Sequence, residues 1–372
     1  MSAFNAAMLA KSLVIVLSLS SVTLPGQNLQ PAIDGSTPDI QEGRLRVNAA
    51  GGHLKEELQL AGDYLVGRGV PRDPTLAAYW YRKAADQGDP GAQTQLGFLY
   101  SSGLGVQPDQ AQAAKWFDRA LAGGSELAKL NLAVMYLKGT GVQRDIHLGI
   151  DLLTELAKKD NAQAQSYLGL VYYLGYGVKV DHPVGEKWFA RAAKQHNPDA
   201  EYNMGTLYST TDDHQRDLSK AADYLRSSAQ AGYVPAMHSL GLLLVNHPEM
   251  PQKPGEAAEL LETASGAGAW RSSVILGILA RDGRGVPRDS EAACVWFRIA
   301  AKEGGDKAQK LLSADLGKCA PSSQSLEAEE SQRAADWMKQ HPHASLYVYG
   351  DKLQQGQFPI PEVPILDLAQ MN

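Results

Sequence analysis

Five turns of the sequence carry the pattern Gly-x-Gly-Val, which glycine-rich phosphate-binding loops also contain. A dinucleotide-binding loop needs a third glycine and lies between a strand and a helix. Here the third glycine is absent, and helical patterns flank each turn. We therefore predict that these glycines end helices and bind no phosphate. The five turns begin at Gly67, Gly103, Gly139, Gly175 and Gly283.

The histidines and carboxylates form no catalytic or metal-binding motif. The 9 histidines are scattered, and the sequence has no His-Glu-x-x-His pair, no Cys-x-x-Cys and no nucleophile elbow. One cluster, Asp212, Asp213, His214 and Asp217, has side chains that suit a divalent ion. We interpret it as a solvated loop, because it lies in a turn between helices. No catalytic residue, metal or cofactor is therefore predicted, and the protein is not expected to be an enzyme.

The chain has only two cysteines, Cys294 and Cys319. Cys294 falls on a predicted helix, and Cys319 ends the following helix, which should run back beside the first. A disulfide is therefore geometrically feasible, and closing this loop would stabilise the fold by on the order of 3 kcal/mol. In the alternative, Cys294 is buried as a small apolar group and Cys319 is a free thiol.

The composition is that of an ordinary globular protein. The 372 residues carry a formal charge of −6, with 44% hydrophobic and 20% charged residues. No apolar run approaches the roughly 20 residues of a membrane-spanning helix. No basic stripe is present, so neither nucleic acid nor an anionic membrane surface is an expected partner.

The N-terminus has the features of an export signal. Lys11 precedes the apolar segment 12–19, which is too short to span a bilayer permanently. We expect residues 1–24 to be a signal peptide or leader, residues 25–52 a linker, and the processed protein to be free of membrane insertion, in the periplasm or outside the cell. The alternative is the leader of a cytoplasmic protein, since no clear Ala-x-Ala cleavage site follows.

Internal repetition dominates residues 53–312. The Gly-x-Gly-Val turns recur every 36 residues, and other positions keep the same register through seven units. A period of this length is typical of two helices and two turns. We call a position that recurs every 36 residues a phase. One phase is occupied by Trp80, Trp116, Leu152, Trp188, Tyr224, Leu260 and Trp296, and another by Gly97, Ala133, Gly169, Gly205, Gly241 and Gly277.

Within one unit, the apolar spacing predicts a first helix, helix A, over about residues 92–102. Gly103 supplies the left-handed residue that commonly follows a helix. Asp109 should then cap a second helix, helix B, which ends at Gly123. Aspartates stand at the same phase in other units, namely at 73, 145, 181 and 289.

The motif Leu96-Gly97-Phe98-Leu99-Tyr100, followed by Gly-x-Gly-Val, Asp109 and Trp116, resembles the Sel1-like repeat family. The resemblance implies an all-α fold: a right-handed, tetratricopeptide-like α/α solenoid of seven 36-residue helix-turn-helix repeats. A C-terminal capping helix is expected over 313–340. Beyond the resemblance, the prolines at 342, 359, 361 and 364 indicate an extended tail over 341–372, with a disordered tail as the alternative. Residues 211–213 and 247–249 depart from the family pattern, because the Gly-x-Gly turn is missing there.

Helix A also carries a row of side chains opposite its expected buried stripe. Since the inner helices of such solenoids line a concave surface, this row predicts a peptide-binding groove. In the alternative, the row is buried between neighbouring repeats. The predicted groove residues are Gln95, Phe98, Asn131, Val134, Tyr167, Leu170, Tyr173, Tyr202, Asn203 and His238. The same row also holds Thr94, Ser101, Leu130, Leu137, Ser166, Thr206, Ser209, Leu242, Val245, Val274, Ile278 and Arg281, and Ser239 lies beside it.

The resemblance implies a non-catalytic scaffold or adaptor that binds an unidentified protein or peptide, in a bacterial cell envelope. A cytoplasmic regulatory scaffold is one alternative. The other is an envelope enzyme or a protein that binds peptidoglycan or β-lactams, but the chain lacks the recurring cysteine pairs of such relatives and any recognisable nucleophile.

Overall fold

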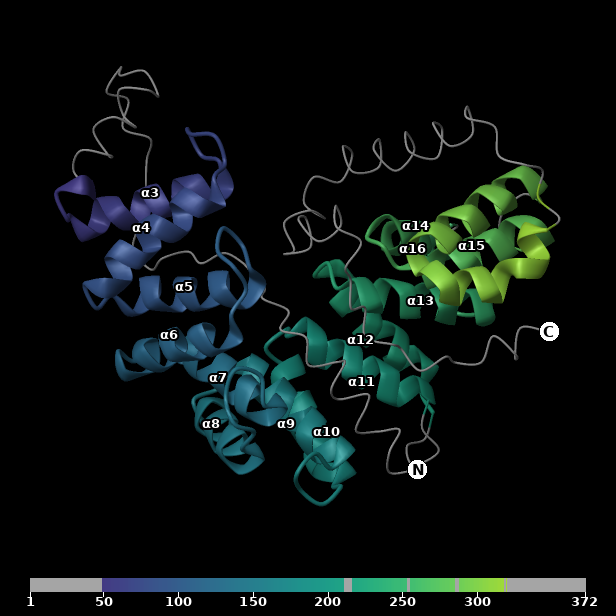
Figure 1. Cartoon of the computed structure of the whole chain (residues 1–372). Coiled ribbons are helices and arrows are strands. Elements are labelled where there is room, and N and C mark those ends of the chain that lie inside the picture. Colours follow the sequence, from purple (N-terminus) through teal and green to yellow (C-terminus); the bar gives the residue numbers. More distant parts are fainter. Residues whose placement is uncertain (1–48, 211–215, 253–254, 285–287, 318, 320–372) are drawn as a thin grey trace, which may run out of the picture. The chain divides into compact units, whose positions relative to one another are not determined.

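The computed structural model of the protein describes residues 49–210, 216–252, 255–284, 288–317 and 319. Within these ranges every regular element is an α-helix, which confirms the predicted all-α class (Figure 1). The helices are α3 (Leu54–Val66), α4 (Pro74–Asp86), α5 (Pro90–Ser102), α6 (Gln110–Ala122), α7 (Glu126–Lys138), α8 (Ile146–Lys158), α9 (Ala162–Leu174), α10 (His182–Ala193), α11 (Pro198–Thr210), α12 (Leu218–Gln230), α13 (Val234–Asn246), α14 (Glu256–Gly266), α15 (Trp270–Asp282) and α16 (Ser290–Leu316).

Several predicted segments lie outside the described residues. They are the leader, most of the linker, Asp212, Asp213 and His214, and everything beyond residue 319, including most of the predicted capping helix and the whole tail.

Aspartate caps set the start of the B helices. In α6 the carboxylate of Asp109 accepts a hydrogen bond from Gln112 N at 3.0 Å, which satisfies one of the unpaired amides of the first turn. The same cap begins five further helices, so the predicted role of this phase is confirmed. These caps are Asp73, Asp145, Asp181, Asp217 and Asp289.

The turn between helix A and helix B is closed by backbone bonds. Gly103 has φ 73°, and its amide donates to Leu99 O at 2.8 Å. Asp109 N then donates to Tyr100 O at 2.9 Å, which brings the start of α6 back to the end of α5. Two helices flank the turn, as predicted for a helix stop.

An arginine five residues after the first turn glycine adds a side-chain cap that sequence inspection missed. In each of three units its Nε donates to a carbonyl near the end of helix A at 3.1 Å. The pairs are Arg72 with Leu65, Arg144 with Leu137, and Arg288 with Arg281. The recurrence of arginine at one phase was the available signal.

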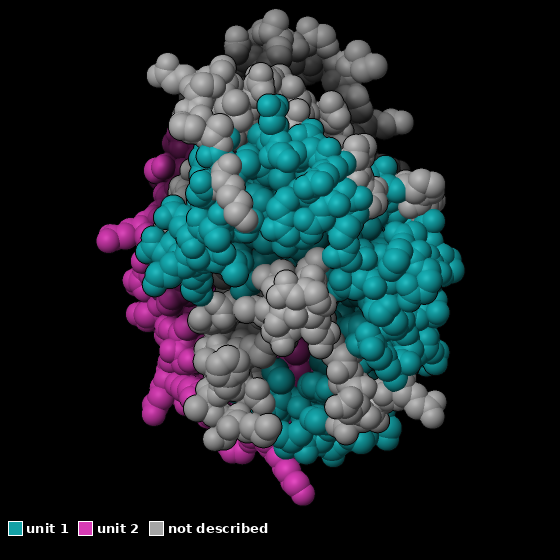
Figure 2. All heavy atoms as spheres, turned by 90° about the vertical axis from the view of Figure 1, so that its right-hand side faces the viewer, with its two compact units in different colours: residues 1–22, 172–176, 180–372 teal, residues 23–171, 177–179 magenta. Residues whose placement is uncertain are grey.

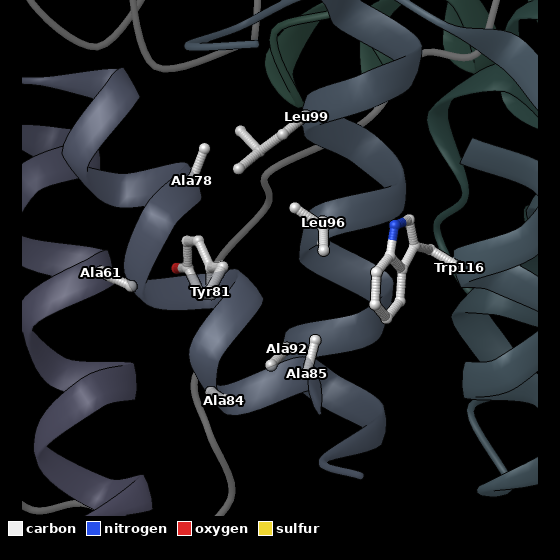
Figure 3. Close-up of a cluster of buried hydrophobic side chains, with 9 residues drawn as sticks. All are labelled: Ala61, Ala78, Tyr81, Ala84, Ala85, Ala92, Leu96, Leu99 and Trp116. Atoms are coloured by element: carbon white, nitrogen blue, oxygen red, sulfur yellow. The ribbon is translucent and has the colours of Figure 1, made fainter. Parts of the chain in front are cut away.

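Helices A and B approach each other closely where a glycine faces a large side chain. A Cβ at Gly97 would lie 2.6 Å from Phe117 Cε1, so only glycine fits against this ring. Leu96, Leu99 and Trp116 pack with Tyr81 and five alanines in one apolar cluster (Figure 3). The shared glycine phase is thus a packing requirement between the two helices of a unit.

The described residues divide into two compact units (Figure 2). The N-terminal unit comprises 49–171 and 177–179, and the C-terminal unit comprises 172–176 and the described part of 180–319. Helices α3 to α8 pack successively in the first unit, and α10 to α16 do so in the second. This succession of neighbouring helices is the arrangement of a helical repeat array.

Helix α16 contains a break at Gly305, where φ is 56° and ψ is −144°. Two helical segments therefore meet there, the first being helix B of the last predicted unit. Gly304 lies against Trp270, since a Cβ on it would come within 2.7 Å of the indole. The second segment ends at Leu316, three residues before Cys319, which was predicted to end this helix.

Candidate functional site

In the N-terminal unit, the predicted groove residues are mostly buried. Phe98 is 8% exposed and its ring lies 5.2 Å from that of Phe117, while Val134 is 2% exposed. These apolar side chains belong to the protein interior, so their assignment to an accessible groove was wrong. Removing these apolar side chains from water by packing them between helices lowers the free energy of the fold, so they are buried and not exposed.

The polar members of the row are buried there too. Asn131 is 3% exposed, and its Nδ2 donates to Leu127 O at 2.7 Å, one turn earlier on the same helix. Tyr167 is 9% exposed. Both were predicted to belong to the groove, and burial makes them unsuitable for contact with a partner. Only Gln95 and Leu170 remain half-buried among the predicted residues of this unit.

His238, in the C-terminal unit, is also buried. It is 7% exposed, and its Nδ1 lies 2.8 Å from Ser272 Oγ. Burial lowers the pKa of His238 to about 4, and the charge of Arg271 acts in the same direction. His238 is therefore a neutral, internally hydrogen-bonded histidine, and its predicted place in the groove was wrong.

Val274 is 3% exposed and therefore buried as well, whereas the remaining groove residues of the C-terminal unit keep accessible surface. Tyr173 and Tyr202 are half-buried, with rings 4.4 Å from His182 and 5.4 Å from Tyr233, and Asn203 is half-buried as well. Helices α11, α13 and α15 are the A helices of successive units. Helix α11 contacts α13, and α13 contacts α15, so these A helices are neighbours. We call the following half-buried residues the helix A face: Tyr202, Asn203, Thr206, Ser209, Ser239, Leu242, Val245, Ile278 and Arg281.

The helix A face combines apolar and hydrogen-bonding side chains. Leu242, Val245 and Ile278 supply apolar contact area, while Asn203 and Ser239 carry an amide and a hydroxyl. At one end, Arg281 donates to Asp315 at 3.0 Å and to Asp282 at 2.7 Å. This composition suits an extended peptide, whose backbone needs hydrogen bonds and whose side chains need apolar contact.

A buried carboxylate lies behind this face. Glu201 is 3% exposed; its Oε1 accepts from Ser227 Oγ at 2.7 Å and lies 3.2 Å from His196 Nδ1. In a hydrolase triad the imidazole stands between the hydroxyl and the acid, whereas here the acid stands in the middle. The arrangement therefore does not activate the Ser227 hydroxyl as a nucleophile.

The second oxygen of Glu201, Oε2, is buried without a hydrogen-bond partner among the described residues. Glutamine occupies this phase in two other units. Gln93 and Gln165 each donate through Nε2 to the carbonyl eight residues earlier, at 3.1 Å. A carboxylate has no N–H group and cannot donate a hydrogen bond to a carbonyl, so Oε2 of Glu201 lacks the bond that a glutamine nitrogen makes at this phase.

The two cysteines are bonded to each other. Cys294 of the first segment of α16 is joined to Cys319, with their Cα atoms 5.6 Å apart. The bond ties the residue that follows the second helical segment to helix B of the last predicted unit, and the alternative of a free Cys319 is therefore not observed. Of the polar cluster predicted as a solvated loop, only Asp217 lies in the described part of the chain, where it caps α12.

Two kinds of feature are absent from the part of the chain that the structure describes. No group of three or more His, Cys, Asp or Glu side chains is arranged there to hold a metal ion. None of the described helices has both the length and the apolar character to cross a membrane.

Comparison with known proteins relates the chain to one family. The model described as Sel1 repeat matches residues 57–89, 90–125, 127–161, 162–197, 198–233 and 274–305. A Sel1 repeat protein from Oxalobacter formigenes has a similar crystal structure, with a TM-score of 0.55 and 30% identity, covering 77% of this chain and 82% of that one.

A second similar structure is that of c5321, a protective antigen of uropathogenic Escherichia coli strains that displays an SLR fold. It is 25% identical, with a TM-score of 0.43, and the match covers 86% of this chain and 75% of that one. No curated protein matches the chain. Residues 234–273, which include α13 and α14, lie between two stretches that the family model matches.

Proposed function

The chain belongs to the Sel1 repeat family, whose members typically serve as protein-interaction scaffolds, and we propose that this protein binds an extended segment of another protein on the helix A face. Its role is to hold a partner, without chemistry of its own. The observation that carries the proposal is the contrast between the two units at the same repeat positions.

In the N-terminal unit these positions are filled by Phe98, Val134 and Leu137, which form core. In the C-terminal unit Thr206, Leu242 and Val245 stand at the equivalent places and keep accessible surface. An interaction site needs side chains that lose water on binding. Leu170 is half-buried at this repeat position in the N-terminal unit, whereas among the described residues of the C-terminal unit such side chains recur on α11, α13 and α15 in succession. The proposed binding surface is therefore shorter than the groove predicted from the sequence.

We further propose that the protein is exported. Two features support this: the apolar segment 12–19 after Lys11, and the disulfide between Cys294 and Cys319, since disulfides persist in oxidising compartments. N-terminal sequencing of the protein from its host should give a mature start between Ser20 and Ala32. An intact Met1 would instead favour the cytoplasmic scaffold.

The binding surface can be tested by site-specific photocrosslinking in the host. A benzophenone amino acid replaces Leu242 in one variant and Ile278 in a second; Leu148, 37% exposed on α8, serves as the matched control. We expect the first two variants to crosslink to the same polypeptide and the control not to do so. Leu242→Glu, added to the Ile278 variant, should abolish that adduct, because a buried unpaired carboxylate opposes binding.

The proposal fails if neither position gives an adduct, or if the Leu148 control captures the same polypeptide. It also fails if Leu242→Glu leaves the adduct at Ile278 unchanged. Far-UV circular dichroism of each variant would check that the helices are intact.

A further inference from the structure

A cavity of about 430 Å³ opens to solvent among α12, α13 and α14 of the C-terminal unit. Its volume falls in the range of small-ligand sites, which is about 300–1,000 Å³. The cavity lies on the side of the B helices, and Leu240, the α13 residue that lines it, is not part of the helix A face. The residues used below are Arg226, Ala229, Leu240, Glu256 and Leu260.

The repeat register shows what fills this place elsewhere in the molecule. Four periods of 36 residues earlier, the positions of Arg226, Ala229, Leu240 and Leu260 are held by Arg82, Ala85, Leu96 and Trp116. Ala85, Leu96 and Trp116 belong to one apolar cluster of the N-terminal unit, and Figure 3 shows the indole beside Leu96. Trp116 is only 4% exposed, so its ring occupies that space fully.

In the N-terminal unit, where Trp116 fills this place, a guanidinium lies beside the indole. The Cζ atom of Arg82 lies over the Trp116 ring, 5.4 Å from its centroid, at a distance suited to a cation–π contact. At the equivalent place, Arg226 is held by an ion pair in which its Nε donates to Glu256 Oε1 at 3.0 Å. The alanine, the leucine and the arginine of the aromatic site are thus all retained, while Leu260 replaces the ring, Leu244 replaces Tyr100 and Glu256 replaces Gln112.

We propose that this cavity binds a planar aromatic side chain of a protein partner, an indole above all, in the place that Trp116 fills in the other unit. Leu260 is shorter than tryptophan and leaves the ring position open. Ala229 and Leu240 provide apolar contact, and the Arg226 guanidinium provides a cation for the ring face.

The position of the cavity in the chain supports a specialised role. Leu240 and Leu260 both lie in residues 234–273, the stretch that the Sel1 family model leaves unmatched. The ordinary turn of the repeat is also absent there, and Pro251 of the replacing segment lines the cavity. The site therefore arises where the chain departs from the family pattern.

The direct test measures binding of 5-fluoroindole by fluorine NMR. N-acetyl-tryptophanamide and N-acetyl-leucinamide are peptide-like probes whose binding is measured by their displacement of 5-fluoroindole. The wild-type protein should bind both aromatic probes, and binding of the leucine amide should be weaker by about tenfold. Leu260→Trp should abolish binding of all three, because the new indole fills the cavity. Arg226→Met, which keeps the length of the side chain, should weaken aromatic binding by about threefold to tenfold.

The matched control is Leu152→Trp, which makes the same change at the same repeat phase of the N-terminal unit and should leave binding unchanged. Thermal melts check that the variants fold. If Leu260→Trp does not fold, Arg226→Met still tests the proposal. The proposal is overturned if the wild-type protein binds no aromatic probe, if the leucine amide binds equally well, or if neither variant weakens binding. Leu242→Glu should not affect these probes, so this result is independent of the helix A face.

Discussion

Replacing Gly105 with alanine should destabilise the protein more than the same change at Gly69. Both are the second glycine of a Gly-x-Gly turn, with φ of 72° and 71°. A Cβ at Gly105 would overlap the carbonyl of Pro74, at the start of the preceding helix B, and would lie 2.8 Å from Thr75 N. A Cβ at Gly69 meets nothing within 4 Å, because no helix of a preceding repeat lies there among the described residues.

The two positions therefore separate a backbone cost from a packing cost. A left-handed conformation costs an alanine roughly 1–2 kcal/mol, and this applies equally at both sites. At Gly105 the overlap is with backbone, so the repeats must move apart, which adds about 1–3 kcal/mol. The free energy of unfolding should thus fall by about 1–2 kcal/mol for Gly69→Ala and by about 2–5 kcal/mol for Gly105→Ala.

Urea denaturation followed by far-UV circular dichroism measures both losses. Gly141→Ala should resemble Gly105→Ala, since its Cβ would overlap the carbonyl of Gln110. At Gly177 the overlap is with the side chain of Ile146, which can shift, so the loss should be smaller. Equal losses at Gly69 and Gly105 would refute the argument that this glycine is required for contact between repeats.

Three further predictions concern Glu201, His238 and the disulfide. Glu201→Gln should raise the free energy of unfolding by about 1 kcal/mol in urea titrations, because a glutamine can donate to the carbonyl eight residues earlier, as Gln165 does; a loss of stability would contradict this. The contribution of His238 to the unfolding free energy should fall by about 3 kcal/mol as pH drops from 6.5 to 4, since His238 binds a proton in the unfolded chain before it does so in the fold; this contribution is measured as the difference between the pH profiles of the wild type and His238→Gln. Reduction of the Cys294–Cys319 bond with dithiothreitol should cost on the order of 3 kcal/mol, and the double variant with serine at both positions should be insensitive to the reductant.

Local features of the fold were predictable because short-range chemistry controls them. An aspartate before a helix satisfies amides two or three residues away, and Gly103 adopts a left-handed conformation that other residues avoid. Both depend on neighbours in sequence, so the helix boundaries around Asp109 were predicted to within two residues. The 36-residue period then implied that each unit repeats the same pair of helices.

The candidate site was predictable only in part. The sequence identified the row on helix A, but it left open whether Phe98 or Leu242 would be accessible. Sequence alone also showed that Leu260 interrupts a phase of aromatic residues, without showing that an open cavity results. Both outcomes depend on how closely the next helices pack, and that distance is set by side chains one or more repeats away.

The amino-acid sequence by itself determined the helical repeat, its caps and turns, and the membership of the family, because these follow from periodicity and from contacts within a single unit. Only the tertiary structure decided that His238 and Tyr167 are interior residues, that Cys294 and Cys319 are bonded, and that the place of an indole stands open beside Arg226. The physical reason is that burial is a property of packing between units. Residues of identical phase can therefore be core in one unit and surface in another.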